Sequence, residues 1–162
     1  MQSMTCILWD MEDCPIPEGL DPASVYENIQ SALANNGYGG EVTIHAIGDK
    51  NQIPGYFESA GIELIRAGDR HARRLEMTRG IFGWTYHYPE SNLMVISRDS
   101  SDFSSSLESC WLDAALKILI AQPRMAPRRC RNCRLNIASA EWLWETLAVG
   151  GDPIVINEHP SL

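Results

Sequence analysis

The sequence lacks several features that would place the protein in a familiar class. No hydrophobic run approaches the roughly 18 residues of a membrane span. No basic stretch precedes an apolar one near the N-terminus, so we expect no signal peptide. A glycine-rich phosphate loop and a Gly-x-Ser-x-Gly elbow are both missing, which argues against nucleoside-triphosphate and serine-hydrolase chemistry. The last three residues lack the basic residue of a peroxisomal tail.

Cysteine is sparse, and its pattern does not suggest a disulfide scaffold. The chain has five cysteines, an odd number, in a sequence long enough to form its own core. Cys130 and Cys133 form a single Cys-x-x-Cys without the second pair or nearby histidine that a structural zinc site needs. We therefore expect a reducing intracellular compartment, the cytoplasm or the nucleus.

Basic residues are few but clustered. The formal net charge is −8, which by itself argues against a nucleic-acid partner. Ten of the thirteen Lys and Arg residues nevertheless lie in two segments, at positions 66–79 and 124–134, and the second segment contains no acid. A local cluster can bind phosphate on an acidic protein because salt screens charges beyond ~8 Å. The alternative is a solvated loop or helix face.

Length and composition indicate one folded domain. The chain has 162 residues, 44% of them hydrophobic and 21% charged. The predicted strands are residues 5–10, 42–47, 62–65, 93–96 and 116–121. The predicted helices are residues 22–36, 53–60, 69–88 and 103–112, with a last one that carries Trp142, Leu143 and Leu147 and ends at Gly150. This alternation predicts an α/β domain with a mostly parallel sheet.

Apolar residues at several positions suggest which helix faces are buried. In the helix at 69–88 we expect four anchors, although Gly80 and Gly83 weaken that helix. The anchors are Leu75, Ile81, Phe82 and Trp84. The expected core tryptophans are Trp84, Trp111, Trp142 and Trp144.

Two predicted strands end in aspartate. Asp10 is the last residue of the first strand, and Asp99 follows the fourth strand. Asp13 lies three residues after Asp10, and Asp102 lies three residues after Asp99. Ligands of parallel sheets bind at the carboxyl ends of strands, near the point where strand order reverses. Clustered carboxylates repel one another unless a cation neutralises them, and oxygen ligands suit Mg²⁺ or Mn²⁺. The alternative is that these residues are helix caps or turn residues.

The sequence around these acids resembles a known family. Trp9-Asp10-Met11-Glu12-Asp13-Cys14 is similar to the Trp-Asp-x-Glu-Asn-Cys motif of NYN domains, and Ser97-Arg98-Asp99-Ser100-Ser101-Asp102-Phe103 to their Ser-Gly-Asp-x-Asp-Phe motif. The stretch from Gly48 to Pro54, the stretch from Leu119 to Pro123 and the Trp-Leu-Trp at 142–144 resemble plant members of the meiosis-regulator and mRNA-stability (limkain) type. The resemblance covers roughly residues 4–151.

The resemblance implies a PIN-like three-layer fold with about five strands in the order 3-2-1-4-5. It places the domain at residues 4–151 and a C-terminal tail at 152–162. It also implies Mg²⁺- or Mn²⁺-dependent ribonuclease activity in RNA turnover or gene regulation, and it alone allows a peroxisomal location. Asp10 and Asp99 match the family's metal acids, Asp102 matches after one inserted residue, and Asp13 replaces an asparagine.

One family acid has no clear counterpart. A gapless alignment from Ala67 through Trp84 places Arg74 where the family has an acid on the helix after the third strand. Asp69 is the better substitute because it follows the neighbouring strand, and it can equally be a helix N-cap. Arg98 replaces a family glycine beside Asp99, where it can contact phosphate or occupy the metal's place electrostatically.

These observations leave three hypotheses. The leading one is an endoribonuclease of single-stranded or structured RNA. Its catalytic residues are Asp10, Asp99, Asp102 and Asp69, and its metal ligands are Asp10, Asp99, Asp13 and Asp102. The second is an RNA-binding or interaction module without strong catalysis, and the third is a homodimerising scaffold. The predicted RNA-binding residues are Arg74, Arg98, Arg124, Arg128, Arg129, Arg131 and Arg134.

Overall fold

A parallel β-sheet organises the molecule. The computed structural model describes residues 2–124 and 137–155, and within them six strands form one sheet in the order β3-β2-β1-β4-β5-β6. The strands are β1 (Thr5–Asp10), β2 (Val42–Gly48), β3 (Ile62–Arg66), β4 (Asn92–Ile96), β5 (Lys117–Gln122) and β6 (Ala138–Leu143). Every neighbouring pair is parallel. The predicted α/β class and the order of the first five strands are confirmed, and a sixth strand is added.

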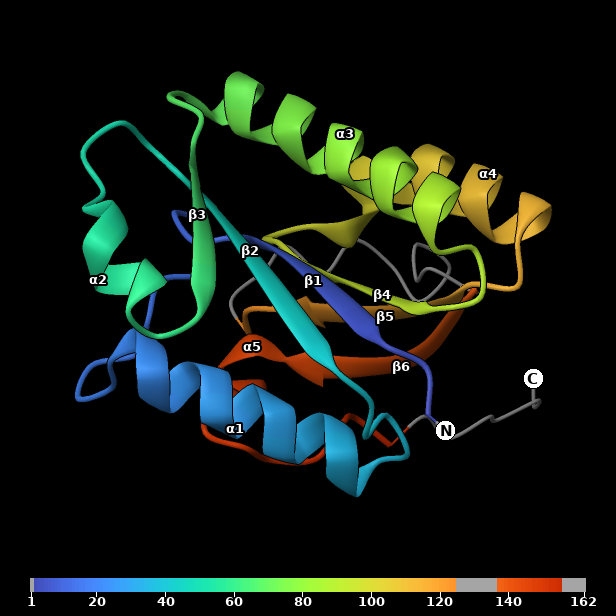
Figure 1. Cartoon of the computed structure of the whole chain (residues 1–162), viewed down its shortest axis with the longest axis horizontal. Coiled ribbons are helices and arrows are strands. Elements are labelled where there is room, and N and C mark those ends of the chain that lie inside the picture. The colour runs from blue at the N-terminus through green and yellow to red at the C-terminus, as the bar shows by residue number, and fades with distance from the viewer. Residues whose placement is uncertain (1, 125–136, 156–162) are drawn as a thin grey trace.

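Helices cover both faces of this sheet (Figure 1). The helices are α1 (Pro22–Asn35), α2 (Pro54–Glu58), α3 (Arg70–His87), the 3-10 helix η1 (Ser100–Phe103), α4 (Ser104–Asp113) and α5 (Trp144–Leu147). Helices α3 and α4 lie on one face, and α1 and α5 lie on the other (Figure 1). In the described part of the chain, no helix has the length and apolar character needed to cross a membrane.

Strand β1 lies inside the sheet and contributes to both hydrophobic layers. All six of its residues are buried, as expected for a parallel strand covered on both faces. Ile7 and Trp9 join the apolar cluster beneath α1 and α5. Cys6 and Leu8 join the cluster beneath α3 and α4. The side chain of Asp10, next in this alternation, therefore enters the α3 side.

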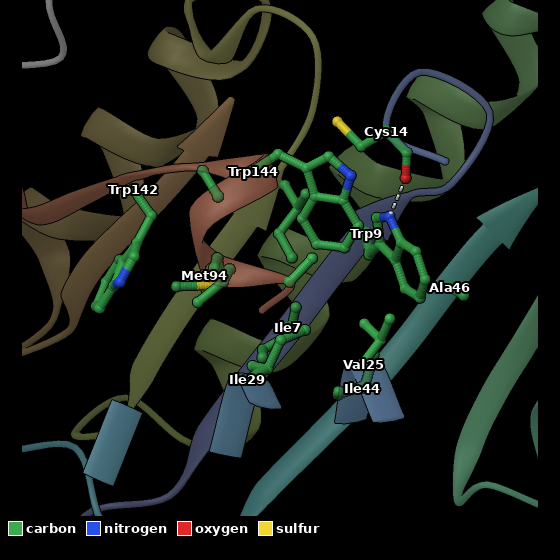
Figure 2. Close-up of a cluster of buried hydrophobic side chains, with 14 of the residues drawn as sticks. Ile7, Trp9, Cys14, Val25, Ile29, Ile44, Ala46, Met94, Trp142 and Trp144 are labelled. Carbon is green, nitrogen blue, oxygen red and sulfur yellow. Dashed lines mark hydrogen bonds between the residues drawn. The ribbon is translucent and has the colours of Figure 1, made fainter. Parts of the chain in front are cut away.

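Three tryptophans fill the α1 side of the sheet (Figure 2). The rings of Trp9 and Trp144 are 5.1 Å apart, and Trp142 is fully buried in the same cluster. The indole of Trp9 donates a 2.7 Å hydrogen bond to the carbonyl of Cys14, and that of Trp144 donates to the carbonyl of Pro15. These contacts fix the turn that follows β1 against the core.

The predicted last helix is wrong in its first half. Trp142 and Leu143 belong to β6, and α5 covers only Trp144–Leu147. Strand β6 has a mixed burial pattern that includes the polar Glu141, and among the described residues it lies at the end of the sheet, paired with β5. Its apolar residues do not alternate cleanly enough to identify a strand from the sequence.

The predicted buried face of α3 is also wrong. Its buried residues are Arg73, Met77, Ile81 and Thr85, at intervals of four, whereas Leu75 is 54% exposed and Phe82 is 45% exposed. Ile81 is the anchor that the prediction placed correctly, and Trp84 is half-buried against the same cluster. Trp111 on α4, expected in the core, is 41% exposed. The prediction failed because it assigned only apolar side chains to the core face.

Candidate nucleic-acid interface

Strand order reverses between β1 and β4, and the sequence-predicted acids lie at that point. The two strands pair directly, with Trp9 opposite Ile96. Asp10 ends β1, so it lies level with Ser97, and Asp99 follows two residues later. Helix α3 begins at the same edge because it follows β3. This is the edge at which parallel α/β sheets bind ligands.

The carboxylate of Asp10 is buried and organises the turn after β1. Only 3% of the residue is exposed. Its Oδ1 accepts hydrogen bonds from the backbone N–H groups of Glu12 at 3.1 Å and Asp13 at 3.2 Å. The alternative interpretation of Asp10 as a turn residue therefore has a direct structural basis.

The side chain of Arg73 neutralises this carboxylate. Its Nε lies 3.1 Å from Oδ1 and 3.3 Å from Oδ2 of Asp10, and it donates to both. Its terminal nitrogens lie 3.7 Å from Oδ1 of Asp13 and 3.4 Å from the carbonyl oxygen of Gly68. The side chains of Arg73 and Asp10 are 10% and 4% exposed, so the ion pair is largely shielded from water.

Several opposing effects act on the Asp10 carboxyl. Burial raises its pKa above the ordinary value of 3.8, and the neighbouring charge of Asp13 raises it further. The hydrogen bond from the Asp13 N–H and the positive charge of Arg73 lower the pKa. Because burial is the largest of these effects, the ionised form depends on Arg73 and the turn amides for its stability.

Asp99 and Asp102 lie on the other side of the strand reversal. Asp99 caps η1: its Oδ1 accepts from the N–H of Ser101 at 3.0 Å and from the Ser101 hydroxyl at 2.6 Å. Asp102 pairs with Arg74 on α3, and Arg70 lies 3.9 Å from the same carboxylate oxygen. The predicted phosphate contact Arg74 is thus an ion-pair partner of a predicted metal ligand.

Asp69 caps α3. Its side chain accepts a 2.8 Å hydrogen bond from the N–H of Ala72. The second interpretation of Asp69, as a helix N-cap, is therefore confirmed. A catalytic role for Asp69 stays a prediction.

Two residues of the site, Arg73 and Glu12, were not predicted from the sequence. The signal for Arg73 was its spacing, because it precedes Met77 and Ile81 by four and eight residues and so shares their face. Glu12 accepts from the N–H of Asp49 at 3.2 Å and from the Gln52 amide at 2.7 Å. It links the turn after β1 to the loop after β2, a contact between distant residues that no local pattern indicates.

Exposed cations extend along the same edge. Arg66 is the last residue of β3, and Arg70 is the first residue of α3. The other three follow strands β2, β4 and β5 in turn: Lys50, Arg98 and Arg124. Of the predicted RNA-binding arginines, Arg74, Arg98 and Arg124 lie in the described part of the chain, and Arg124 and Arg98 are exposed. Four others lie outside the described residues: Arg128, Arg129, Arg131 and Arg134.

The described residues do not fit a preformed divalent-metal site. Within residues 2–124 and 137–155, no three His, Cys, Asp or Glu side chains gather closely enough to hold a metal ion. Both carboxylate oxygens of Asp10 accept from Arg73, and Asp102 pairs with Arg74. A divalent ion at Asp10 would have to share that carboxylate with a buried guanidinium of the same charge sign.

Comparison with known proteins agrees with this fold. The chain is similar to a crystal structure of a protein of unknown function from Vibrio parahaemolyticus, with a TM-score of 0.60 and 14% identity over 88% of this chain and 92% of that chain. Such low identity supports the fold alone. No curated protein matches the chain. A model of the NYN domain matches residues 4–138, well over half of the sequence. The chain therefore belongs to the NYN domain family, a family of PIN-like nuclease domains.

Proposed function

We propose that this NYN domain binds RNA along the carboxyl edge of its sheet. The observation that carries the proposal is the row of exposed cations at that edge in a protein with a net charge of −8. Arginine and lysine recognise phosphate oxygens, and guanidinium groups do so with two parallel hydrogen bonds. Membership of a PIN-like nuclease family supports RNA as the polyanion.

The strand order arranges these cations in a line. Arg66 ends β3, Lys50 follows β2, Arg98 follows β4 and Arg124 follows β5. At ~4.8 Å between neighbouring strands, the distance from β3 to β5 is about 19 Å, which allows contact with several consecutive phosphates. Of the acids at the same edge, Asp10 is buried, and Asp99 accepts hydrogen bonds within the fold. Asp69 and Asp102 are exposed; Asp69 caps α3, and Asp102 pairs with Arg74.

Charge reversal tests this proposal. We expect Arg70→Glu combined with Arg98→Glu to weaken binding of a fluorescent single-stranded RNA at least tenfold and to lower the salt dependence of binding by about one unit per lost phosphate contact. Arg79→Glu is the matched control, because Arg79 is exposed on the same helix about 13 Å further along. Equal affinities for all three proteins would contradict the proposal.

A second candidate is metal-dependent hydrolysis of RNA. It is favoured by the family and by the position of Asp10, Asp13, Asp99 and Asp102 around the strand reversal. Incubating the protein with labelled RNA and Mn²⁺ tests it. Cleavage that Asp10→Asn and Asp99→Asn both abolish would establish the activity. Absence of cleavage, or cleavage that both variants retain, would refute catalysis by this site.

The closer relationship to plant members of the meiosis-regulator and limkain type is a further part of the proposal. It is supported by the stretch from Gly48 to Pro54 and by the Trp-Leu-Trp at 142–144. It suggests a role in the regulation of gene expression through RNA.

A further inference from the structure

Arg73 lies between Asp10 and Asp13, the two acids at the end of β1 and in the turn that follows it. Its guanidinium contacts the carboxylates of both Asp10 and Asp13 from the inner face of α3. Arginine is seldom buried unless it is paired, and this one is 8% exposed. It therefore has the position and charge sign of a cation bound by these acids.

A charge count shows what Arg73 does to the site. Asp10 and Asp13 together carry two negative charges when ionised, and Arg73 supplies one positive charge, so the group carries a single net negative charge. A divalent ion added to this group would face a buried like charge at short range, where water screens weakly. With Arg73 absent, the two carboxylates would match a divalent ion in charge.

Ser97 supplies an independent observation. It is 3% exposed, and its Oγ is the buried side-chain polar atom without a hydrogen-bond partner in the described part of the chain. Alternation along β4 puts Leu93 and Val95 on the α3 side, so Ser97 lies on the same side as Asp10 and level with it. A buried hydroxyl without a partner is costly unless water or an ion completes it.

We propose that Arg73 is a resident cation in the place of a divalent metal, and that Asp10, Asp13 and Ser97 form a latent divalent-ion site. In the protein as it stands, Mg²⁺ and Mn²⁺ do not bind at Asp10. Removal of the guanidinium opens the site to them. The inference concerns ion binding alone, so it is tested without RNA and can fail or succeed independently of the proposed function.

Thermal unfolding in MnCl₂ is the test. For Arg73→Met we expect Tm to rise by about 5 °C or more at Mn²⁺ concentrations 100-fold above the dissociation constant. The unchanged protein and the surface control Arg79→Met should show equal, smaller responses. Adding Asp10→Asn to Arg73→Met should abolish the rise. An Arg73→Met variant that responds no more than the unchanged protein would overturn the proposal.

A second measurement requires no Arg73 variant. Mn²⁺ is paramagnetic and broadens the NMR signals of nearby amides. In the unchanged protein we expect no selective broadening of the Glu12 and Asp13 amides, which donate to Asp10. Selective broadening of these signals that Asp10→Asn removes would show that an ion binds despite Arg73, and the proposal would be wrong.

Discussion

Trp9 and Asp10 are neighbours on β1, yet their side chains enter opposite layers of the molecule. Trp9 packs among aromatic rings beneath α1 and α5, and its indole donates to the carbonyl of Cys14. Asp10 lies beneath α3 and accepts from the amides of Glu12 and Asp13 and from a guanidinium. The same turn is thus fixed from one face by packing and from the other by charge.

The two layers have different roles: the Trp9 layer stabilises the fold by apolar packing, and the Asp10 layer sets the charge of the candidate site. The Trp9 layer has apolar partners from several elements and does not need an ionised group. The Asp10 layer depends on one cation from α3 to hold a buried negative charge. Changes on the two sides should therefore differ in size and in their sensitivity to ions.

The largest expected effect is on the tryptophan side. Trp9→Ala should lower the free energy of unfolding by about 3–5 kcal/mol, because it leaves a cavity in a fully buried aromatic cluster. Urea denaturation monitored by circular dichroism measures the loss. A loss below about 1 kcal/mol would mean that this layer is not the main support of the turn.

A slightly smaller effect is expected on the aspartate side. Arg73→Met should lower the free energy of unfolding by about 3 kcal/mol, since it leaves Asp10 buried without its counter-ion. Arg79→Met, on the exposed face of the same helix, should change stability by no more than about 0.5 kcal/mol. The same urea titration compares them, and equal effects would remove the distinction between the two positions.

The smallest effect concerns the packing of α3 on the Asp10 side. A Cβ at Gly80 would lie 2.9 Å from Cδ2 of Leu8 on β1, whereas a Cβ at Gly83 meets nothing within 4 Å. Gly83→Ala should stabilise the protein by about 0.5–1 kcal/mol through helix propensity. Gly80→Ala should gain less or lose stability because Leu8 must move. Equal gains in Tm would show that α3 does not need close contact with β1.

Much of the fold was predictable because its signals are local. The cap formed by Asp21 and Pro22 set the start of α1, and Asp69 set the start of α3. Short apolar runs marked the five strands from β1 to β5. These elements depend on neighbouring residues, so a single sequence contains the information that locates them.

The chemistry of the site was less predictable because it depends on distant partners. Asp10 and Arg73 are 63 positions apart, and neither residue indicates the other. An arginine at a core position interrupts the apolar pattern of a helix, and only the position of the Asp10 carboxylate in the fold explains it. Strand β6 was not predicted for a related reason. It is recognisable as a strand by its pairing with β5 and not by its own sequence pattern.

Measuring RNA binding with and without divalent ions decides whether Arg73 or a metal ion supplies the positive charge at Asp10. Fluorescence anisotropy with a labelled single-stranded RNA should give the same Kd in EDTA and in Mn²⁺ at equal ionic strength, because cations of the chain neutralise the acids and contact the phosphates. Binding that requires Mn²⁺ and is lost in Asp10→Asn would show the opposite, that a metal ion supplies the positive charge assigned to Arg73.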